Sequence, residues 1–221
     1  MLQKIKVNKF TLNKINREFL DIARVLLKKK FKNLDKILKN ITKKDEQILF
    51  NAYNLSLKIY DLLNPLKNLI EKKIQKKLIL WTYPQVRIDL KRKKKYSAPL
   101  HKDQWILSKG NIGYIVWLPI NIGGGSLKFL LKRTKNLKIK KNSYWGLEIK
   151  KDGLETTSQK INFGEAIIFD HNQIHESDLE NQRISIQFRF KELNKSLRSR
   201  GINQIIDSKI KKYWLNKLNA K

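Results

Sequence analysis

The sequence contains no cysteine among its 221 residues, and only three of those residues are histidines. The absence of cysteine excludes disulfide bonds, thiolate metal sites and cysteine nucleophiles, and it suits a reducing, cytoplasmic location, which we expect. No apolar run approaches the roughly eighteen residues that a membrane-spanning helix needs. The N-terminus also lacks the pattern of a secretory signal. A metal site in this chain must therefore be built from histidine and carboxylate.

Acidic residues are scarce as well, because 19 Asp and Glu stand against 49 Lys and Arg, for a net charge of +30. Such a charge attracts phosphates, nucleic acid or an anionic membrane surface. Lysine far outnumbers arginine, however, and Lys, Ile and Asn all have AT-rich codons, so codon bias is an alternative origin. Residues 91–95 (KRKKK) form the densest cluster, which is either a solvated loop or an attractor for an anionic substrate. Charge alone identifies no partner.

Residues 1–78 show the three- and four-residue spacing of apolar side chains that is typical of helices. Thr42 and Asp45 resemble a capping box that opens a second helix, which we extend to Tyr60, and Pro65 fits the first turn of a third. The first predicted helix carries its apolar side chains at Phe19, Ile22, Ala23, Leu26, Leu27 and Phe31. Exposed apolar faces on these helices would make a homodimer plausible.

From Trp81 onward the period changes to that of strands, separated by turn-forming stretches such as 121–125 (NIGGG). The predicted strands are residues 86–90, 114–120, 126–131, 165–169 and 183–190. Several short strands at this spacing favour a β-sandwich or barrel. The fold class that we expect is mainly β with helical additions, closed by an amphipathic helix at 205–218.

We expect one compact domain made of three parts. Residues 1–78 form a helical region packed on the core, 79–192 form the β core, and 193–221 form a C-terminal helical segment. Neither an internal repeat nor a long linker interrupts the chain.

His101 and Asp103 are two residues apart, so in an extended segment both side chains lie on one face and can reach one ion. His175 follows far downstream, just after the strand at 165–169. Two His and one carboxylate on one face of an octahedron leave three positions open, which is the ligand set of non-haem Fe(II) oxygenases. His171 competes with His175 for the third position.

The strand at 183–190 (RISIQFRF) alternates between polar and apolar side chains. Arg183, Ser185, Gln187 and Arg189 share one face. A buried guanidinium can clamp a carboxylate through two parallel hydrogen bonds, and a hydroxyl can add another, so this face suits an anionic co-substrate. The alternative is an outer sheet face with solvated arginines.

His101-Lys102-Asp103, the run GEAIIFDHNQIHES (164–177) and Arg183-Ile184-Ser185 resemble the signature of the phytanoyl-CoA dioxygenase-like enzymes, which depend on Fe(II) and 2-oxoglutarate. The resemblance covers about residues 84–190. It implies a double-stranded β-helix, the jelly-roll or cupin-like barrel, with iron near one open end.

By this resemblance His101, Asp103 and His175 are the catalytic iron ligands, and Arg183 binds the distal carboxylate of 2-oxoglutarate with help from Ser185. Arg189 lies on the same predicted face and is the alternative anchor. The acid at position 103 favours hydroxylation, because the related halogenases have a small residue there.

Four further residues are candidates around the site. Trp117 lies where the resemblance puts an aromatic beside 2-oxoglutarate, although a Trp on an apolar strand is more often core. Arg87 points either toward substrate or co-substrate, or pairs with a nearby acid. Gln104 and Trp105 follow the iron motif directly and would line the mouth.

Three functions compete on these observations. The first is a 2-oxoglutarate-dependent hydroxylase of a small or medium-sized metabolite. The second applies the same chemistry to nucleic acid, as a demethylase does. The third is a non-catalytic basic binding module on a jelly-roll scaffold, which would bind neither iron nor 2-oxoglutarate.

Overall fold

The computed structural model describes residues 2–90, 98–103, 113–131, 137–142, 146–178 and 182–193. Its helices are α1 (Lys9–Leu27), α2 (Leu34–Asn40), α3 (Lys43–Leu55), the 3-10 helix η1 (Leu57–Leu62) and α4 (Leu63–Ile74). Its strands are β1 (Leu2–Lys6), β2 (Leu78–Asp89), β3 (Gly113–Pro119), β4 (Gly125–Leu130), β5 (Ile139–Asn142), β6 (Gly146–Ile149), β7 (Thr156–Ile161), β8 (Glu165–Asp170), β9 (His175–Ser177) and β10 (Arg183–Glu192).

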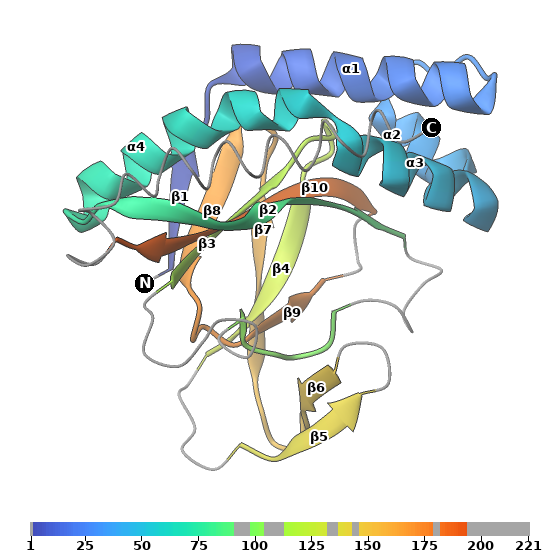
Figure 1. Ribbon diagram of the computed structural model, residues 1–221. Helices are drawn as coiled ribbons and strands as arrows, with labels where there is room; N and C mark the ends of the chain where they lie inside the picture. Colours follow the sequence, from blue (N-terminus) through green and yellow to red (C-terminus); the bar gives the residue numbers. More distant parts are fainter. Residues whose placement is uncertain are drawn as a thin grey trace.

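The strands form antiparallel sheets stacked beneath a layer of helices (Figure 1). The larger sheet has the order β1-β8-β3-β10-β2, the second sheet has the order β7-β4-β9, and β5 pairs with β6 in a separate hairpin. The prediction of a mainly β chain with helical additions is confirmed. The double-stranded β-helix and the three-part domain division stay predictions.

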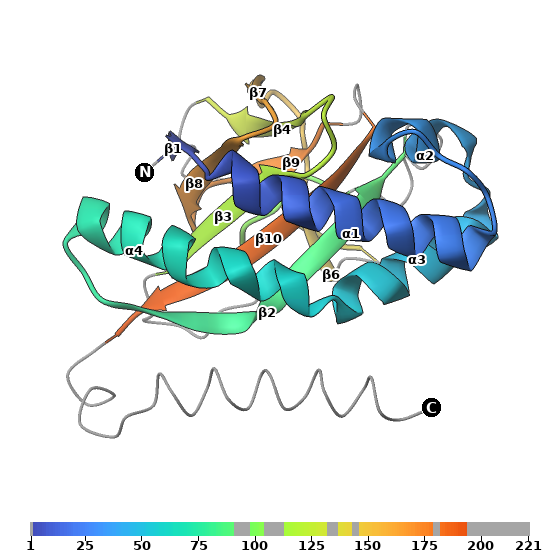
Figure 2. The same ribbon diagram turned by 90° about the horizontal axis from the view of Figure 1, so that it is seen from above.

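The helices cover one face of the five-stranded sheet, with α1 and α4 lying across it in the view from above (Figure 2). Every second side chain of β10 points into this layer: Ile184, Ile186, Phe188 and Phe190 are fully buried in the same apolar cluster as the helices. Because such burial contributes about 1.5–3 kcal/mol for each large side chain, this layer holds the helices on the sheet.

A second apolar cluster lies on the opposite face, between the two sheets. It consists of Ile115, Trp117, Leu127, Phe129, Ile161, Ile167 and Phe169. Side chains from β3, β4 and β8 thus meet in the space that also receives the polar face of β10.

The helix boundaries agree with the sequence in part. Thr42 and Asp45 form the predicted capping box of α3, and Pro65 lies in the first turn of α4. The prediction is wrong at Phe31, because α1 ends at Lys28 in the left-handed conformation, and at Tyr60, which lies in the 3-10 helix. The intervening helix α2 was not predicted, since seven residues span only about two turns and give little periodicity.

Residues 1–78 are not wholly helical, because β1 pairs with β8 at the edge of the larger sheet, from Leu2 opposite Phe169 to Lys6 opposite Glu165. Alternate side chains of β1 are exposed, including Lys4 and Lys6. Lysines on an edge strand discourage pairing with another chain, and in so short a segment they also hide the strand pattern.

The predicted C-terminal helix at 205–218 lies outside the described residues. Among the helices that the structure does describe, none combines the length and the apolar character needed to cross a bilayer.

Candidate metal centre

His101 and His175 lie opposite each other on adjacent backbone segments and exchange two hydrogen bonds. The His101 N–H donates to the His175 carbonyl at 3.0 Å, and the His175 N–H donates to the His101 carbonyl at 3.1 Å. Directly opposed residues of an antiparallel pair project to the same side, and the two imidazole rings accordingly lie 4.3 Å apart between centroids. The backbone itself therefore brings the two predicted ligands together.

One nitrogen of each ring is engaged with the backbone. His101 Nδ1 lies 2.7 Å from the Pro99 carbonyl, and His175 Nδ1 lies 2.9 Å from the Gln173 carbonyl. A carbonyl can only accept, so each Nδ1 carries the proton and each Nε2 keeps its lone pair. Fixing the tautomer in this way is what metal-binding histidines ordinarily require of their surroundings.

Asp103 completes the group as a fully buried carboxylate. Its Oδ2 lies 3.5 Å from His175 Nε2 and has no hydrogen-bond partner among the described residues. One ligand atom from each of His101, Asp103 and His175 lies within 4.8 Å of the others, so the three could hold one metal ion. The structure thus brings together all three predicted ligands, while their role as iron ligands stays a prediction.

The charges of the group are set by burial and by its neighbours. Burial lowers the pKa of His175 to about 3, and burial also lowers the pKa of His101. Burial opposes ionisation of Asp103, but Arg189 and the two histidines hold the pKa of this carboxyl below its usual value. Neutral imidazoles and an ionised carboxylate are the protonation states that metal binding needs.

Aromatic rings line one side of the group. The Phe169 ring meets the His175 ring edge-on at 4.6 Å between centroids, and the Phe129 ring lies 6.1 Å from it. Both phenylalanines belong to the cluster between the two sheets. An apolar wall of this kind restricts water and lowers the local dielectric around a bound ion.

The polar face of β10 points into the same inter-sheet space and is buried along its whole length. Arg183, Ser185, Gln187 and Arg189 have exposed fractions of 0%, 1%, 6% and 7%. The alternative of a solvated outer face is therefore wrong, because the three-stranded sheet covers this side. Four buried polar side chains in a row need partners or a ligand.

Arg183 is held at the start of β10 by a carboxylate, a carbonyl and an indole. Its Nη2 lies 2.9 Å from Asp89 Oδ2, its Nη1 donates to the Asp178 carbonyl, and its guanidinium carbon lies 5.1 Å from the centroid of the Trp117 ring. The Asp89 contact is close but not aligned as a hydrogen bond. Arg183 Nε and Nη2 and Ser185 Oγ consequently have no hydrogen-bond partner among the described residues.

Arg87, Gln104 and Trp105 are the other residues that the sequence predicts around the site. Arg87 lies with Nη2 3.2 Å from Asp89 Oδ1, so the pairing with a nearby acid is present. Asp89 is thus shared between two arginines, and although burial opposes its ionisation, these arginines hold its pKa below the usual value. Gln104 and Trp105, like the cluster at 91–95, lie outside the described residues.

His171 does not belong to the metal group. The Gly113 N–H donates to His171 Nδ1 at 2.8 Å, and the His171 N–H donates to the Gly113 carbonyl at 2.9 Å. These bonds join the end of β8 to the start of β3. A role for His171 in this backbone junction accounts for its burial.

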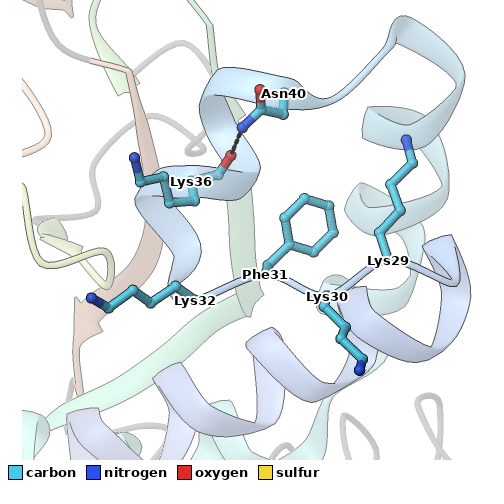
Figure 3. Close-up of a pocket in the computed structure, with 6 residues that line it drawn as sticks. All are labelled: Lys29, Lys30, Phe31, Lys32, Lys36 and Asn40. Atoms are coloured by element: carbon cyan, nitrogen blue, oxygen red, sulfur yellow. Dashed lines mark hydrogen bonds between the residues drawn. The ribbon is translucent and has the colours of Figure 1, made fainter.

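A cavity of about 540 Å³ between α1 and α2 lies apart from the metal group (Figure 3). It is lined by Lys29, Lys30, Phe31, Lys32, Lys36 and Asn40. The lysine side chains point in different directions rather than toward one point, and Asn40 donates to the Lys36 carbonyl. No histidine or carboxylate is among its lining residues, so the candidate metal site is in the inter-sheet space.

Two residues of the site carried no recognisable signal in the sequence. Gly125 lies against the Arg183 side chain, and Ser126 next to it has a buried hydroxyl without a partner among the described residues. Gly125 ends, and Ser126 follows, a glycine run that indicated only a turn. Gly125 and Ser126 belong to the site because β4 packs against β10, and a contact between distant strands leaves no pattern in the local sequence.

No protein-family model matches the sequence, and no curated protein matches it. Several solved structures are similar over part or most of the chain. The structure of EvdO2 from Micromonospora carbonacea var. aurantiaca complexed with 2-oxoglutarate is 15% identical, with a TM-score of 0.38 over 52% of each chain, so the overlap spans about half of that protein.

Two others cover more of the chain. AviO1 from Streptomyces viridochromogenes is 11% identical, with a TM-score of 0.48 over 86% of this chain and 89% of that one. The epimerase SnoN in complex with Fe3+, alpha ketoglutarate and nogalamycin RO is 13% identical, with a TM-score of 0.45 over 85% and 78%. These scores are too low to carry an argument, so we rest the function on the residues of the site.

Proposed function

We propose that this protein is an oxygenase that depends on Fe(II) and 2-oxoglutarate and hydroxylates a small or medium-sized metabolite. The observation that carries the proposal is the group of His101, Asp103 and His175, of which the last two are buried and whose ligand atoms lie within 4.8 Å of one another. The polar face of β10 lines the same inter-sheet space with arginine and serine donors that lack partners among the described residues.

The donor set fits iron. Two imidazoles and one carboxylate suit Fe(II) and leave coordination positions for other ligands, whereas the thiolate ligands of many zinc and copper sites are absent from this chain. Asp103 Oδ2, which faces His175 Nε2 and has no hydrogen-bond partner among the described residues, fits the same interpretation. Asp103 also favours hydroxylation over halogenation, since its carboxylate fills a ligand position.

The charges of the interior fit a dianionic co-substrate. The ion-paired groups Arg87–Asp89–Arg183 and Arg189–Asp103 hold three guanidinium groups and two carboxylates. A divalent cation would add two further positive charges to a buried space, which is costly without an anion. A dicarboxylate such as 2-oxoglutarate supplies the missing negative charge.

Arg183 is the residue that we assign to the distal carboxylate of 2-oxoglutarate. Its Nε–H and the Ser185 hydroxyl are buried donors without a hydrogen-bond partner among the described residues, and a carboxylate can satisfy them. Asp89 and the Trp117 ring hold the guanidinium in place. Arg189 is the weaker alternative, because each of its nitrogens already has a protein partner.

When bound, iron and 2-oxoglutarate would activate dioxygen, with 2-oxoglutarate giving two of the electrons and the substrate the other two, and the protein supplies position and shielding. His101 and His175 present their Nε2 lone pairs because the Pro99 and Gln173 carbonyls hold the protons on Nδ1. Phe129 and Phe169 exclude water from one side. Arg87, which is partly exposed, lies where it could contact a substrate.

Two antiparallel sheets that face each other across a buried polar interior, with the ligands at β9 and beside β10, support a jelly-roll core like that of the phytanoyl-CoA dioxygenase-like enzymes. We propose residues 79–192 as this core, with the helical region 1–78 packed on its larger sheet.

The test is the weak visible band that Fe(II) gives when it is chelated by 2-oxoglutarate in the absence of oxygen. We expect the wild-type protein to show the band, His101→Ala and Asp103→Ala to lose it, and Arg183→Ala to need more 2-oxoglutarate to reach it. His171→Gln is the matched control, because this histidine lies outside the group, and it should keep the band. Wild-type protein that binds neither iron nor 2-oxoglutarate would disprove the proposal.

A further inference from the structure

Arg189 contacts the metal-ligand candidate Asp103 at a different carboxylate oxygen from the one that faces His175. Its Nε donates to Asp103 Oδ1 at 3.1 Å, and its Nη2 lies 3.1 Å from the same oxygen. The other carboxylate oxygen, Oδ2, is the one that faces His175 Nε2 at 3.5 Å. The guanidinium therefore occupies Asp103 Oδ1 and leaves Oδ2 facing the histidine.

Two glutamine side chains accept hydrogen bonds from the other end of the Arg189 guanidinium. Nη1 donates to Gln85 Oε1 at 2.7 Å, and Nη2 donates to Gln187 Oε1 at 3.1 Å. A planar guanidinium with a partner on every nitrogen is held in one orientation. The two glutamines thus fix Arg189, and Arg189 fixes Asp103.

The backbone of β2 makes room for this arrangement. Gln187 of β10 pairs with Gln85, but Arg189 pairs with Thr82, so Tyr83 and Pro84 lie in an irregularity of the ladder. Proline has no N–H to donate, so within a sheet it is found at edges and bulges. Bulges are common beside active sites, where they redirect a side chain.

We infer that Arg189 is a positioning residue: it binds Asp103 Oδ1 so that Oδ2 alone points toward the metal. This inference rests on the proposed function and adds to it a determinant of metal binding that is not itself a ligand. It also removes Arg189 as an anchor for 2-oxoglutarate, since a co-substrate carboxylate would have to displace Asp103 or the glutamines.

Charge and orientation make opposite predictions for a substitution here. By charge alone, a guanidinium beside a cation site repels the cation, so its removal should strengthen metal binding. By orientation, its removal frees the Asp103 carboxylate to turn and should weaken metal binding, and the loss of such outer partners typically costs about 10- to 100-fold in metal affinity. Arg189→Met removes both effects, whereas Arg189→Lys keeps the charge and loses the planar fork.

The experiment titrates the protein with Co(II) alone, without 2-oxoglutarate, and follows the visible ligand-field absorption, which reports coordination geometry as well as affinity. We expect Arg189→Met and Arg189→Lys each to weaken Co(II) binding by about tenfold or more and to change the spectrum. Gln85→Leu, at an exposed position, should weaken binding by about threefold, as expected for one lost hydrogen bond. The exposed Arg17→Met on α1 is the control and should match wild type.

The outcomes separate the inference from the proposed function. If wild type binds Co(II) and both Arg189 variants bind equally well or more tightly with an unchanged spectrum, the positioning role is wrong and the metal site stands. If wild type takes up no Co(II), the proposed function fails, and the role of Arg189 fails with it. If Arg189→Met does not fold, Arg189→Lys and Gln85→Leu decide by the same criteria.

Discussion

Gly125 lies directly against Arg183, in a gap that leaves no room for a side chain. A Cβ at this position would meet Arg183 Cδ at 2.6 Å and Trp117 Cη2 at 2.9 Å. Contacts this short are not tolerated in packed interiors, so either the arginine or the indole would have to move. The glycine therefore sets where the Arg183 guanidinium lies.

We expect Gly125→Ala to weaken 2-oxoglutarate binding by about tenfold while leaving metal binding near wild type. A tenfold loss of affinity corresponds to about 1.4 kcal/mol, which is a modest cost for moving the buried Arg183 guanidinium. Isothermal titration with Co(II), and then with 2-oxoglutarate on the Co(II)-saturated protein, measures the two binding steps separately. Gly123→Ala is the matched control in the same glycine run, since its Cβ would meet the ends of the Asp35 and Asn121 side chains, at 2.8 and 3.5 Å, rather than Arg183. Equal 2-oxoglutarate affinity in the two variants would contradict the assignment of Arg183.

Asp89 is the counter-charge of two arginines, with contacts of 3.2 Å to Arg87 and 2.9 Å to Arg183. Asp89→Asn leaves the fully buried Arg183 without a carboxylate, and removal of one partner from a buried ion pair costs about 3–5 kcal/mol. We expect the free energy of unfolding in urea to fall by about that amount.

The control for this change is Asp61→Asn, which breaks a half-exposed pair with Lys58 at 3.8 Å. Exposed pairs contribute about 0–1 kcal/mol, so the control should unfold near the wild-type midpoint. If the two variants lose the same stability, Asp89 does not act as the counter-charge of Arg183.

The sequence predicted the parts of this site that depend on local spacing. Strand alternation placed Arg183 and Arg189 on one face, and the His-x-Asp spacing paired His101 with Asp103, both as the structure has them. The predicted strands at β3, β4, β8 and β10 are likewise confirmed.

What the sequence could not give depends on contacts between distant segments. Burial of the polar face of β10 requires a second sheet, and one strand of that sheet, β7 (TTSQKI), has too few apolar residues to be recognised. The reciprocal backbone bonds of His101 and His175 join segments far apart in the chain. The fit of Gly125 against Arg183 is likewise a tertiary contact, and a glycine run alone indicates only a turn.

Metal binding should stabilise the fold, because the ligands come from segments that only the folded chain brings together. At a free Co(II) concentration one hundred times the dissociation constant, linkage predicts a gain of about 2.7 kcal/mol in the free energy of unfolding. Urea titrations with and without Co(II) measure this gain. Asp103→Asn should lose most of it and His171→Gln should keep it, and the reverse ranking would argue for a different ligand set.

The metal-free protein should lose stability as the pH falls below the ordinary pKa of histidine. Burial lowers the pKa of His175 from 6.5 to about 3, so between these values the unfolded chain binds a proton that the folded chain does not. Stability therefore falls with decreasing pH in this window, by about 1.4 kcal/mol for each pH unit from this residue, and is independent of it above the window.

Urea titrations in the presence of a chelator, at a series of pH values across this window, measure the slope. His175→Gln removes the titrating group and should flatten the curve, leaving the contribution of His101, whose pKa burial also lowers. The carboxyls of Asp89 and Asp103, with pKa values below 3.8, act mainly at the acidic end. A slope in His175→Gln as steep as in wild type would mean that His175 is not buried as a neutral imidazole, and the metal centre would then need a different protonation state from the one inferred here.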